Sequence, residues 1–317
     1  NRNQFKPDWE NYQPAKPAFT GTKVIADYPL ESLLDYIDWT PFFITWSLAG
    51  KYPAILEDTK VGAAATELFR DAQKLLKKIV AEKLLTARAV IGFWPANKAG
   101  DNDVELREPN DETKPLATLH FLRQQIPKTD DLANLCLADF VAPASSGKTD
   151  YIGGFAVTTG IGAEQLAAKY QADNDDYSAL LVKALADRLA EAFTEHLHER
   201  VRKEFWAYEP KENLSSQDMI QEKYRGIRPA PGYPACPDHS EKTTLFNLLA
   251  ATAETGIELT ESFAMTPAAS VSGFYFSHPE AKYFSVGKIT QEQIDDIAAR
   301  KNKDPAEMSK LLSPNLE

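Results

Sequence analysis

Two adjoining segments decide the fold class: KVGAAATELFRDAQKLLKKIVAEKLL (Lys60–Leu85) and RAVIGFWPANKAG (Arg88–Gly100). The first carries apolar residues such as Leu68 and Leu75 at helical spacing, which predicts an amphipathic helix. The second is an apolar run that ends in a turn, and DVELRE (Asp103–Glu108) follows it, so two consecutive strands are expected. A helix followed by two strands breaks strict βα alternation. We therefore expect an α+β fold with an antiparallel or mixed sheet, not a doubly wound parallel sheet.

The rest of the chain has the same mixed character. Apolar runs bounded by turn residues, or short alternating segments, predict strands at 22–28, 136–143, 150–160, 257–262, 273–278 and 282–289. Helical spacing predicts helices from about Leu30 and at 175–208, 215–225, 243–256 and 290–302. Residues 1–22 alternate proline, lysine and polar residues with single aromatics and are expected to form a tether, with 23–317 as one domain.

Composition excludes several classes of function. The 317 residues are 43% hydrophobic and 26% charged, which is ordinary for a globular protein with a core. The formal net charge of −11 argues against a nucleic-acid or anionic-membrane partner. It suits a cationic ligand or a basic protein surface, although solubility alone also explains it.

The two cysteines, Cys136 and Cys236, form no disulfide framework and indicate a reducing compartment. The most apolar stretch, Ile37–Gly50, is too short to span a bilayer. No signal peptide opens the sequence, which does not begin with Met. We therefore expect a soluble cytoplasmic protein, or a piece of one.

Two short motifs are weak indications of a functional site. TTGIGAEQL (Thr158–Leu166) resembles a dinucleotide-binding loop, but Gln165 stands where that fingerprint has its third glycine. A glycine turn before a helix is the better interpretation. The hypothesis that the protein is a Rossmann oxidoreductase is supported by this motif alone. CPDH places Cys236 and His239 at a metal-like spacing, yet a structural zinc site needs four ligands, so no metal site is expected.

Acidic residues recur along the predicted long helix. Asp187, Glu191 and Glu195 follow one another at intervals of four, away from the apolar stripe. From the pattern alone, a solvated acidic face explains them better than a ligand site does. His196 and His198 on the same helix point to different faces, which speaks against a shared metal ion.

Asp38 is unusual because it lies among Tyr36, Trp39, Phe42 and Phe43. A carboxylate in such surroundings is costly without a hydrogen-bond donor. It either caps the turn into the following residues or is held for a cationic or hydroxyl-bearing ligand, and the sequence leaves both open.

RPAPGYPACPDHSEK (Arg228–Lys242) contains four prolines and is expected to be a rigid, extended loop. The guanidinium of Arg228 matches a carboxylate in two parallel hydrogen bonds. Gly232 allows close backbone approach, and Tyr233 supplies a ring and a hydroxyl. A ligand-binding loop is favoured over a purely structural one, since loops tend to carry function.

Blocks along the chain resemble the C-terminal activation domain of cobalamin-dependent methionine synthases. The similarity runs from about Lys23 to Pro314. RPAPGY is its most specific part, because it fits the family's Arg-x-x-x-Gly-Tyr signature for S-adenosylmethionine (SAM). The other matching blocks are YIDWTPFFITWSLAGKYPAILED (36–58), CLADFVAP (136–143), KALADRLAEAFTEHLHERVRKEFWAY (183–208) and LTESFAMTPAASVSGFYFSHPEAKYFSVG (259–287).

The resemblance implies a single C-shaped α+β domain around a twisted antiparallel sheet, with SAM in an elongated groove. Asp38 and Glu191 would face the ammonium of SAM, and Arg228 would bind its carboxylate. The aromatic rings would lie beside its sulfonium or its adenine. No catalytic and no metal-binding residue is implied. The SAM-binding residues carried over from the family are Asp38, Glu191, Arg228, Ala230, Gly232, Tyr233, Tyr283 and Phe284.

The resemblance also implies a role. Such a domain presents the SAM methyl group for reductive methylation of inactive cob(II)alamin, with an electron from flavodoxin or a flavodoxin-like reductase. Cobalamin is held by another domain, and zinc only by the homocysteine domain; neither module has a counterpart in this sequence. We therefore expect a fragment of a methyltransferase that cannot run the full reaction alone. The alternative is a docking module for the cobalamin domain and reductant, with SAM as a conformational ligand.

Overall fold

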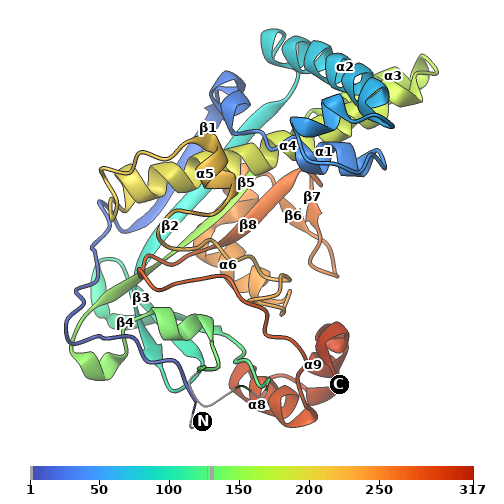
Figure 1. Cartoon of the computed structure of the whole chain (residues 1–317). Helices are drawn as coiled ribbons and strands as arrows, with labels where there is room; N and C mark the ends of the chain where they lie inside the picture. The colour runs from blue at the N-terminus through green and yellow to red at the C-terminus, as the bar shows by residue number, and fades with distance from the viewer. Residues whose placement is uncertain (1–2, 127, 129–131) are drawn as a thin grey trace.

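An antiparallel sheet of six strands forms the centre of the part of the chain that the structure describes (Figure 1). This computed structural model describes residues 3–126, 128 and 132–317, so Asn1 and Arg2 of the predicted tether lie outside it. The strand order is β4-β3-β2-β5-β8, with β1 also paired to β2, and every pairing is antiparallel. The strands are β1 (Gly21–Tyr28), β2 (Thr86–Ala99), β3 (Asp103–Glu108), β4 (Asp111–His120), β5 (Asp150–Ile161) and β8 (Ser270–Tyr275).

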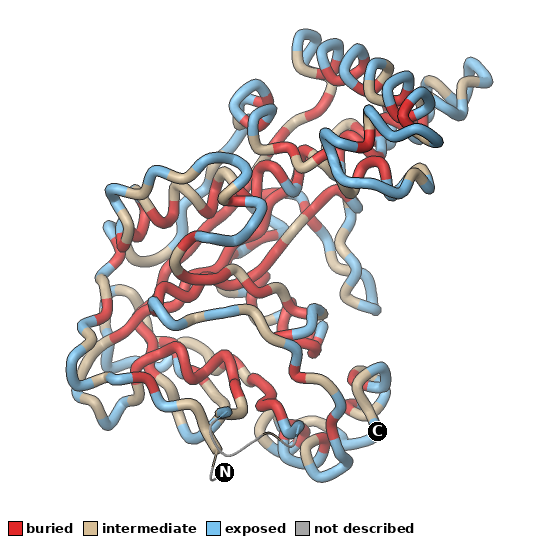
Figure 2. The backbone as a smooth tube through the Cα atoms, viewed as in Figure 1, coloured by how far each residue is buried: buried red, intermediate tan, exposed pale blue. Residues whose placement is uncertain are grey.

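The long strands β2 and β5 are buried on both faces because helices cover each side of the sheet. Successive side chains of a strand point to opposite faces. Thus Ile91 and Phe93 pack with the core around α4 (Asp176–Arg200), whereas Val90 and Trp94 pack with α6 (Glu241–Leu249) and α7 (Ala251–Thr255). Figure 2 shows this buried centre between exposed outer segments.

Helical elements gather at the two ends of the molecule, and the outline in Figure 1 is that of a C. At one end α2 (Gly62–Ala81) and α3 (Ala163–Ala172) accompany α1 (Thr40–Thr45) and the 3-10 helices Leu30–Tyr36 and Ala54–Glu57. At the other end α8 (Gln291–Lys301) and α9 (Pro305–Leu311) enclose a small separate core with Leu122 and Val286. Among the described residues, no helix is both long and apolar enough to cross a membrane.

The predicted α+β class with an antiparallel sheet is confirmed. The helices at 175–208 and 243–256 are present but interrupted: the first continues past Arg200 as a π-helix (Val201–Phe205), and the second breaks at Ala250, which has φ 50°. The short helix α5 (Ser216–Ile220) and the strand β6 (Glu258–Leu259) fall within predicted segments. The partner of β6, β7 (Met265–Thr266), lies outside every predicted strand.

Two predicted strands are wrong. The segment 136–143 is a 3-10 turn (Leu137–Phe140), because the carboxylate of Asp139 accepts the backbone N–H of Cys136 and folds the chain back. Among the described residues, the segment 282–289 joins no named strand, and Ile289 makes an isolated bridge with Leu316. The neighbouring edge of β8 is already paired, and the Val286 N–H donates instead to the carbonyl of Pro234 at 2.8 Å.

The glycine motif 158–166 ends β5 and begins α3, with Gly162 in the left-handed region before the helix. Because β5 pairs antiparallel with both β2 and β8, this is not the parallel βαβ unit of a dinucleotide site.

The N-terminal segment lies across the sheet's flank and is fixed at several points. The ammonium of Lys148 donates to the carbonyls of Trp9 and Tyr12 at 2.6 and 2.8 Å. The indole N–H of Trp206 donates to the carbonyl of Ala15 at 2.8 Å.

Candidate ligand-binding site

The start of the proline loop and the residue before it extend the sheet beyond β8. The Ile227 N–H donates to the Phe276 carbonyl at 3.0 Å, and the Phe274 N–H donates to the Pro229 carbonyl at 2.9 Å. A Cβ on Gly273 would lie 2.8 Å from the Pro229 carbonyl oxygen, so the glycine permits this approach. Ile227 is buried in the α6-side core, and Arg228, next in an extended segment, therefore faces the opposite side, toward α4.

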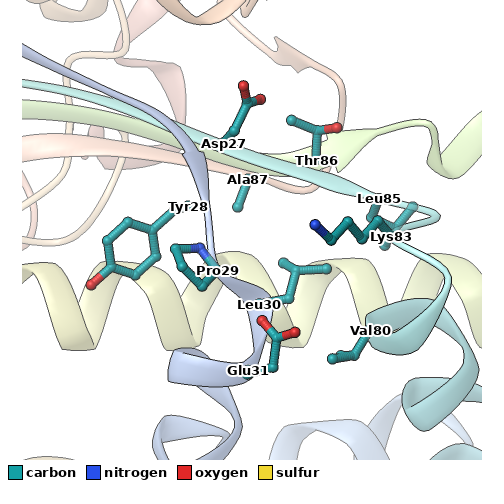
Figure 3. Close-up of a pocket in the computed structure, with 10 residues that line it drawn as sticks. All are labelled: Asp27, Tyr28, Pro29, Leu30, Glu31, Val80, Lys83, Leu85, Thr86 and Ala87. Atoms are coloured by element: carbon teal, nitrogen blue, oxygen red, sulfur yellow. The ribbon is translucent and has the colours of Figure 1, made fainter.

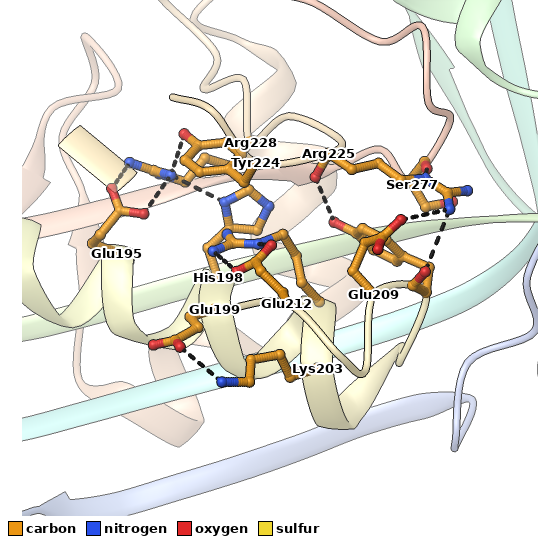
Figure 4. Close-up of polar contacts among 12 residues, drawn as sticks. Glu195, His198, Glu199, Lys203, Glu209, Glu212, Tyr224, Arg225, Arg228 and Ser277 are labelled. Carbon is orange, nitrogen blue, oxygen red and sulfur yellow. Dashed lines mark hydrogen bonds and ion pairs between the residues drawn. The ribbon is translucent and has the colours of Figure 1, made fainter. Parts of the chain in front are cut away.

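Arg228 meets the side chain of Glu195 on α4 (Figure 4). Its Nη2 lies 2.6 Å from Oε2 of Glu195, and its Nη1 lies 3.3 Å from Oε1. The same Nη1 donates to the Tyr224 hydroxyl at 2.6 Å and lies 3.0 Å from Nδ1 of His198. Burial lowers the pKa of Arg228, but the Glu195 carboxylate and neighbouring groups more than offset this, so the pKa is raised overall. The sequence pattern alone placed Glu195 on a solvated acidic face, and this prediction is wrong for Glu195.

The proline loop is compact, not extended as predicted. The Gly232 N–H donates to the Cys236 carbonyl at 2.7 Å, and the Cys236 N–H donates to the Tyr233 carbonyl at 2.9 Å. Gly232 has φ +94°, and a Cβ there would lie 2.1 Å from the ring of His239. The prolines thus accompany a turn that closes on itself. The backbone N–H groups of Gly232 and Cys236 serve the loop and are not free for a ligand.

The segment after β8 returns to the same place. The Tyr283 hydroxyl accepts the backbone N–H of Arg228 at 3.0 Å. Both Tyr283 and Phe284 pack on the α6-side core. These contacts, with that of Val286 to Pro234, join three distant parts of the sequence around one space.

That space is a cavity of about 350 Å³. Six of the eight residues predicted to bind a ligand line it, and Gly232 belongs to the loop that borders it. The cavity-lining residues are Phe155, Glu191, Thr194, Glu222, Arg228, Pro229, Ala230, Tyr233, Pro234, Ala235, Val271, Tyr283 and Phe284. Thr194 could have been found from helical periodicity, since it lies three residues after Glu191. Glu222, after α5, carries no sequence signal.

The cavity combines both signs of charge with aromatic surface. Burial raises the pKa of the Glu222 carboxyl, while Arg228 opposes the shift. Burial, and secondly the Glu191 carboxylate, raises the pKa of the Tyr233 hydroxyl. Tyr233 is nonetheless 62% exposed, so this residue of the cavity lining is accessible from solvent. Such a cavity can bind a zwitterion that also carries an apolar or aromatic part.

Asp38 is the predicted site residue that neither lines this cavity nor belongs to the loop that borders it. Its Oδ1 accepts the backbone N–H of Thr40 at 2.9 Å, at the start of α1. The capping contact that the sequence allowed is thus present.

A larger cavity of about 570 Å³ lies between the end of β1, the following 3-10 helix and the start of β2 (Figure 3). Its charged side chains, those of Asp27, Glu31 and Lys83, are exposed, and no predicted site residue lines it. It has no convergent set of buried polar groups and is the weaker candidate.

The described residues contain no group of three or more His, Cys, Asp or Glu side chains placed to hold a metal ion. Burial raises the pKa of the Cys236 thiol well above its ordinary value, which disfavours the thiolate a metal requires. His196 instead lies with its Nε2 2.7 Å from the Tyr28 hydroxyl.

Comparison with known proteins identifies the family. The family model described as "Vitamin B12 dependent methionine synthase, activation domain" matches residues 29–302. The chain belongs to this family. A solved structure of the MetH reactivation domain bound to AdoHcy is 54% identical to this activation domain, with a TM-score of 0.95 over 99% of this chain and 96% of that chain. The activation domain thus has the fold and family that its sequence blocks predicted.

Proposed function

We propose that the domain binds SAM in the cavity between α4, the proline loop and the segment 283–284. The observation that carries this proposal is the meeting of Arg228 with Glu191 and three aromatic rings around one space of about 350 Å³. The AdoHcy bound by the 54% identical reactivation domain is the demethylated form of SAM, which supports the same ligand class here.

Each lining group has a matching part of SAM. Arg228 would bind the carboxylate, and Glu191 the ammonium. The rings of Tyr233, Tyr283 and Phe284 would lie beside the sulfonium or the adenine. Asp38 is carried over from the family as a further contact, at a part of the ligand outside the cavity itself.

We further propose that the domain presents the SAM methyl group for reductive methylation of cob(II)alamin. Cobalamin would be bound by another domain of the enzyme and would supply the methyl acceptor. This chain's residues bind and orient the donor, so their contribution is positioning and not acid–base chemistry. The cobalamin domain and a flavodoxin-type reductant would be its partners.

Calorimetry with SAM and AdoHcy tests the binding proposal directly. We expect about one ligand per chain, and no heat at millimolar ligand would contradict it. The second step needs the full-length enzyme. Loss of reactivation in Arg228→Ala, with docking to the cobalamin domain intact, would support methyl presentation. Normal reactivation with impaired docking would instead favour a docking role for this domain.

A further inference from the structure

Within the part of the chain that the structure describes, the guanidinium of Arg228 is held along one of its two hydrogen-bonding edges (Figure 4). Nη1 and Nη2 together meet the two oxygens of Glu195. Nη1 also donates to Tyr224 and lies against His198. An arginine has five N–H donors. These contacts occupy both hydrogens of Nη1 and one of Nη2.

The other edge is formed by Nε–H and the second hydrogen of Nη2. Among the residues that the structure describes, Arg228 has no acceptor for Nε. These two donors lie side by side in the fork geometry that fits a carboxylate. Because Arg228 lines the cavity, a ligand carboxylate can bind this edge while Glu195 keeps the first.

The groups that hold the first edge are themselves fixed. The side chain of Glu195 is 11% exposed and lies one helical turn after Glu191, which lines the cavity. Burial lowers the pKa of His198 well below its ordinary value, so the ring is neutral and its Nδ1 can accept from Nη1. The ring of His198 is also stacked on Tyr275. Glu195, Tyr224 and His198 therefore set the plane of the guanidinium before any ligand arrives.

We propose that Glu195 is a positioning residue, which holds Arg228 end-on so that its Nε–Nη2 edge receives the carboxylate of the ligand. This inference rests on the proposed binding of SAM. It adds a consequence for specificity: Glu195 governs the affinity for adenosyl ligands that retain the amino-acid part and not for those that lack it.

The experiment compares AdoHcy with 5′-methylthioadenosine, a thioether without the amino-acid part, by calorimetry. In Glu195→Gln the amide keeps the volume but cannot accept from both nitrogens of Arg228, so the guanidinium loses its fixed plane. We expect AdoHcy to bind at least about tenfold more weakly, as for the loss of a charge-assisted contact. The affinity for 5′-methylthioadenosine should change less than about twofold.

The matched control is Glu199→Gln, the same substitution one turn further along α4. Glu199 accepts from Tyr36 and Lys203 and does not line the cavity, so both affinities should stay unchanged. If Glu195→Gln does not fold, Glu195→Asp, with its carboxylate drawn back by one methylene, should show the same selective loss.

Equal weakening of both ligands, unchanged AdoHcy binding, or tighter AdoHcy binding would each overturn the proposal. The last would mean that Glu195 competes with the ligand for Arg228. Absence of AdoHcy binding by the unmodified domain would overturn the proposed function itself, which keeps the two failures distinct.

Discussion

The ammonium of Lys301 lies 2.6 Å from the carboxylate of Glu241, which is fully buried at the start of α6. The same ammonium lies 2.5 Å from Oδ2 of Asp238. Burial raises the pKa of the Glu241 carboxyl, and Lys301 opposes that shift. Next to it on α8, Arg300 pairs with Asp103 of β3. The last turn of α8 thus attaches the C-terminal helices both to the sheet and to the C-terminal part of the proline loop.

Replacing Lys301 by Met should destabilise the domain by about 3–5 kcal/mol, because two buried carboxylates would lose their cation. Urea unfolding measures the change. Lys303→Met is the control, since its pair with Glu307 is partly exposed and should contribute no more than about 1 kcal/mol. Similar losses in the two variants would show that the buried cluster is not a major source of stability.

Acidic pH should lower the stability of the folded domain, partly through His278. Burial, and secondly Arg225, lowers the pKa of His278 to about 4. The ring packs against Trp9 and Tyr12. Since its unfolded pKa is about 6.5, protons bind the unfolded chain more readily. The stability that the fold gains from neutral His278 is fully present above pH 6.5 and is lost as the pH falls toward 4.

Urea unfolding at pH 7 and pH 4.5 tests this expectation. His278→Gln should reduce the pH dependence of the unfolding free energy by about 1–3 kcal/mol between those values. An unaltered pH dependence would assign the acid sensitivity to other groups.

Replacing Arg228 by Ala should weaken SAM binding by about 2–4 kcal/mol, as expected when one partner of a desolvated charge pair is removed. Calorimetry gives the affinity. Arg225→Ala is the control, because Arg225 contacts Glu209 and Ser277 and does not line the cavity. Equal affinity in both variants would make Arg228 a structural residue.

Asp38→Asn separates two roles of one carboxylate. If Asp38 binds the ligand, SAM affinity should fall, while stability changes by less than about 1 kcal/mol, because Asn can still accept the Thr40 N–H. If it acts only as a cap, the variant keeps its affinity for SAM, because Asn still caps Thr40. Thermal melts with and without SAM distinguish these outcomes, and we expect the first.

Gly232→Ala should disturb the proline loop. A Cβ would lie 2.1 Å from the His239 ring, so this ring must move, and φ +94° is strained for alanine. Gly100→Ala is the matched control: its φ is +55°, with nothing within 4 Å of the added carbon. We expect SAM affinity to fall only in Gly232→Ala, measured by calorimetry. A matching loss in Gly100→Ala would attribute the effect to backbone strain in general.

Much of the fold could be predicted, because periodicity reports burial on one face. The helix at α2 and the strands β2 and β3 follow directly from it. The segment 136–143 has equally strong apolar character, but Asp139 folds it into a turn by accepting the Cys136 N–H. Arg123 and Lys98 pair with the buried carboxylate of Asp139 and so hold it in place. Those partners are distant in sequence, so no local pattern reveals them.

The residues that line the cavity were predictable in part, and their role in ligand binding stays a prediction. A resemblance identified Glu191, Arg228 and Tyr283, and all three line the cavity. Glu195 was assigned to a solvated face, since helical spacing shows which residues share a side but not what covers that side. In the fold it is covered by Arg228, which the pairing of Ile227–Pro229 with β8 directs toward α4.

That pairing also covers part of a strand edge. β8 is the last strand of its sheet, and an unpaired strand edge is a template for adding strands from other molecules. Ile227 and Pro229 occupy part of this edge with the same residues that present Arg228. A substitution that loosens the proline loop would therefore expose this edge of β8 to pairing with other molecules. Ligands that hold the loop in place should act as solubilising agents for the domain.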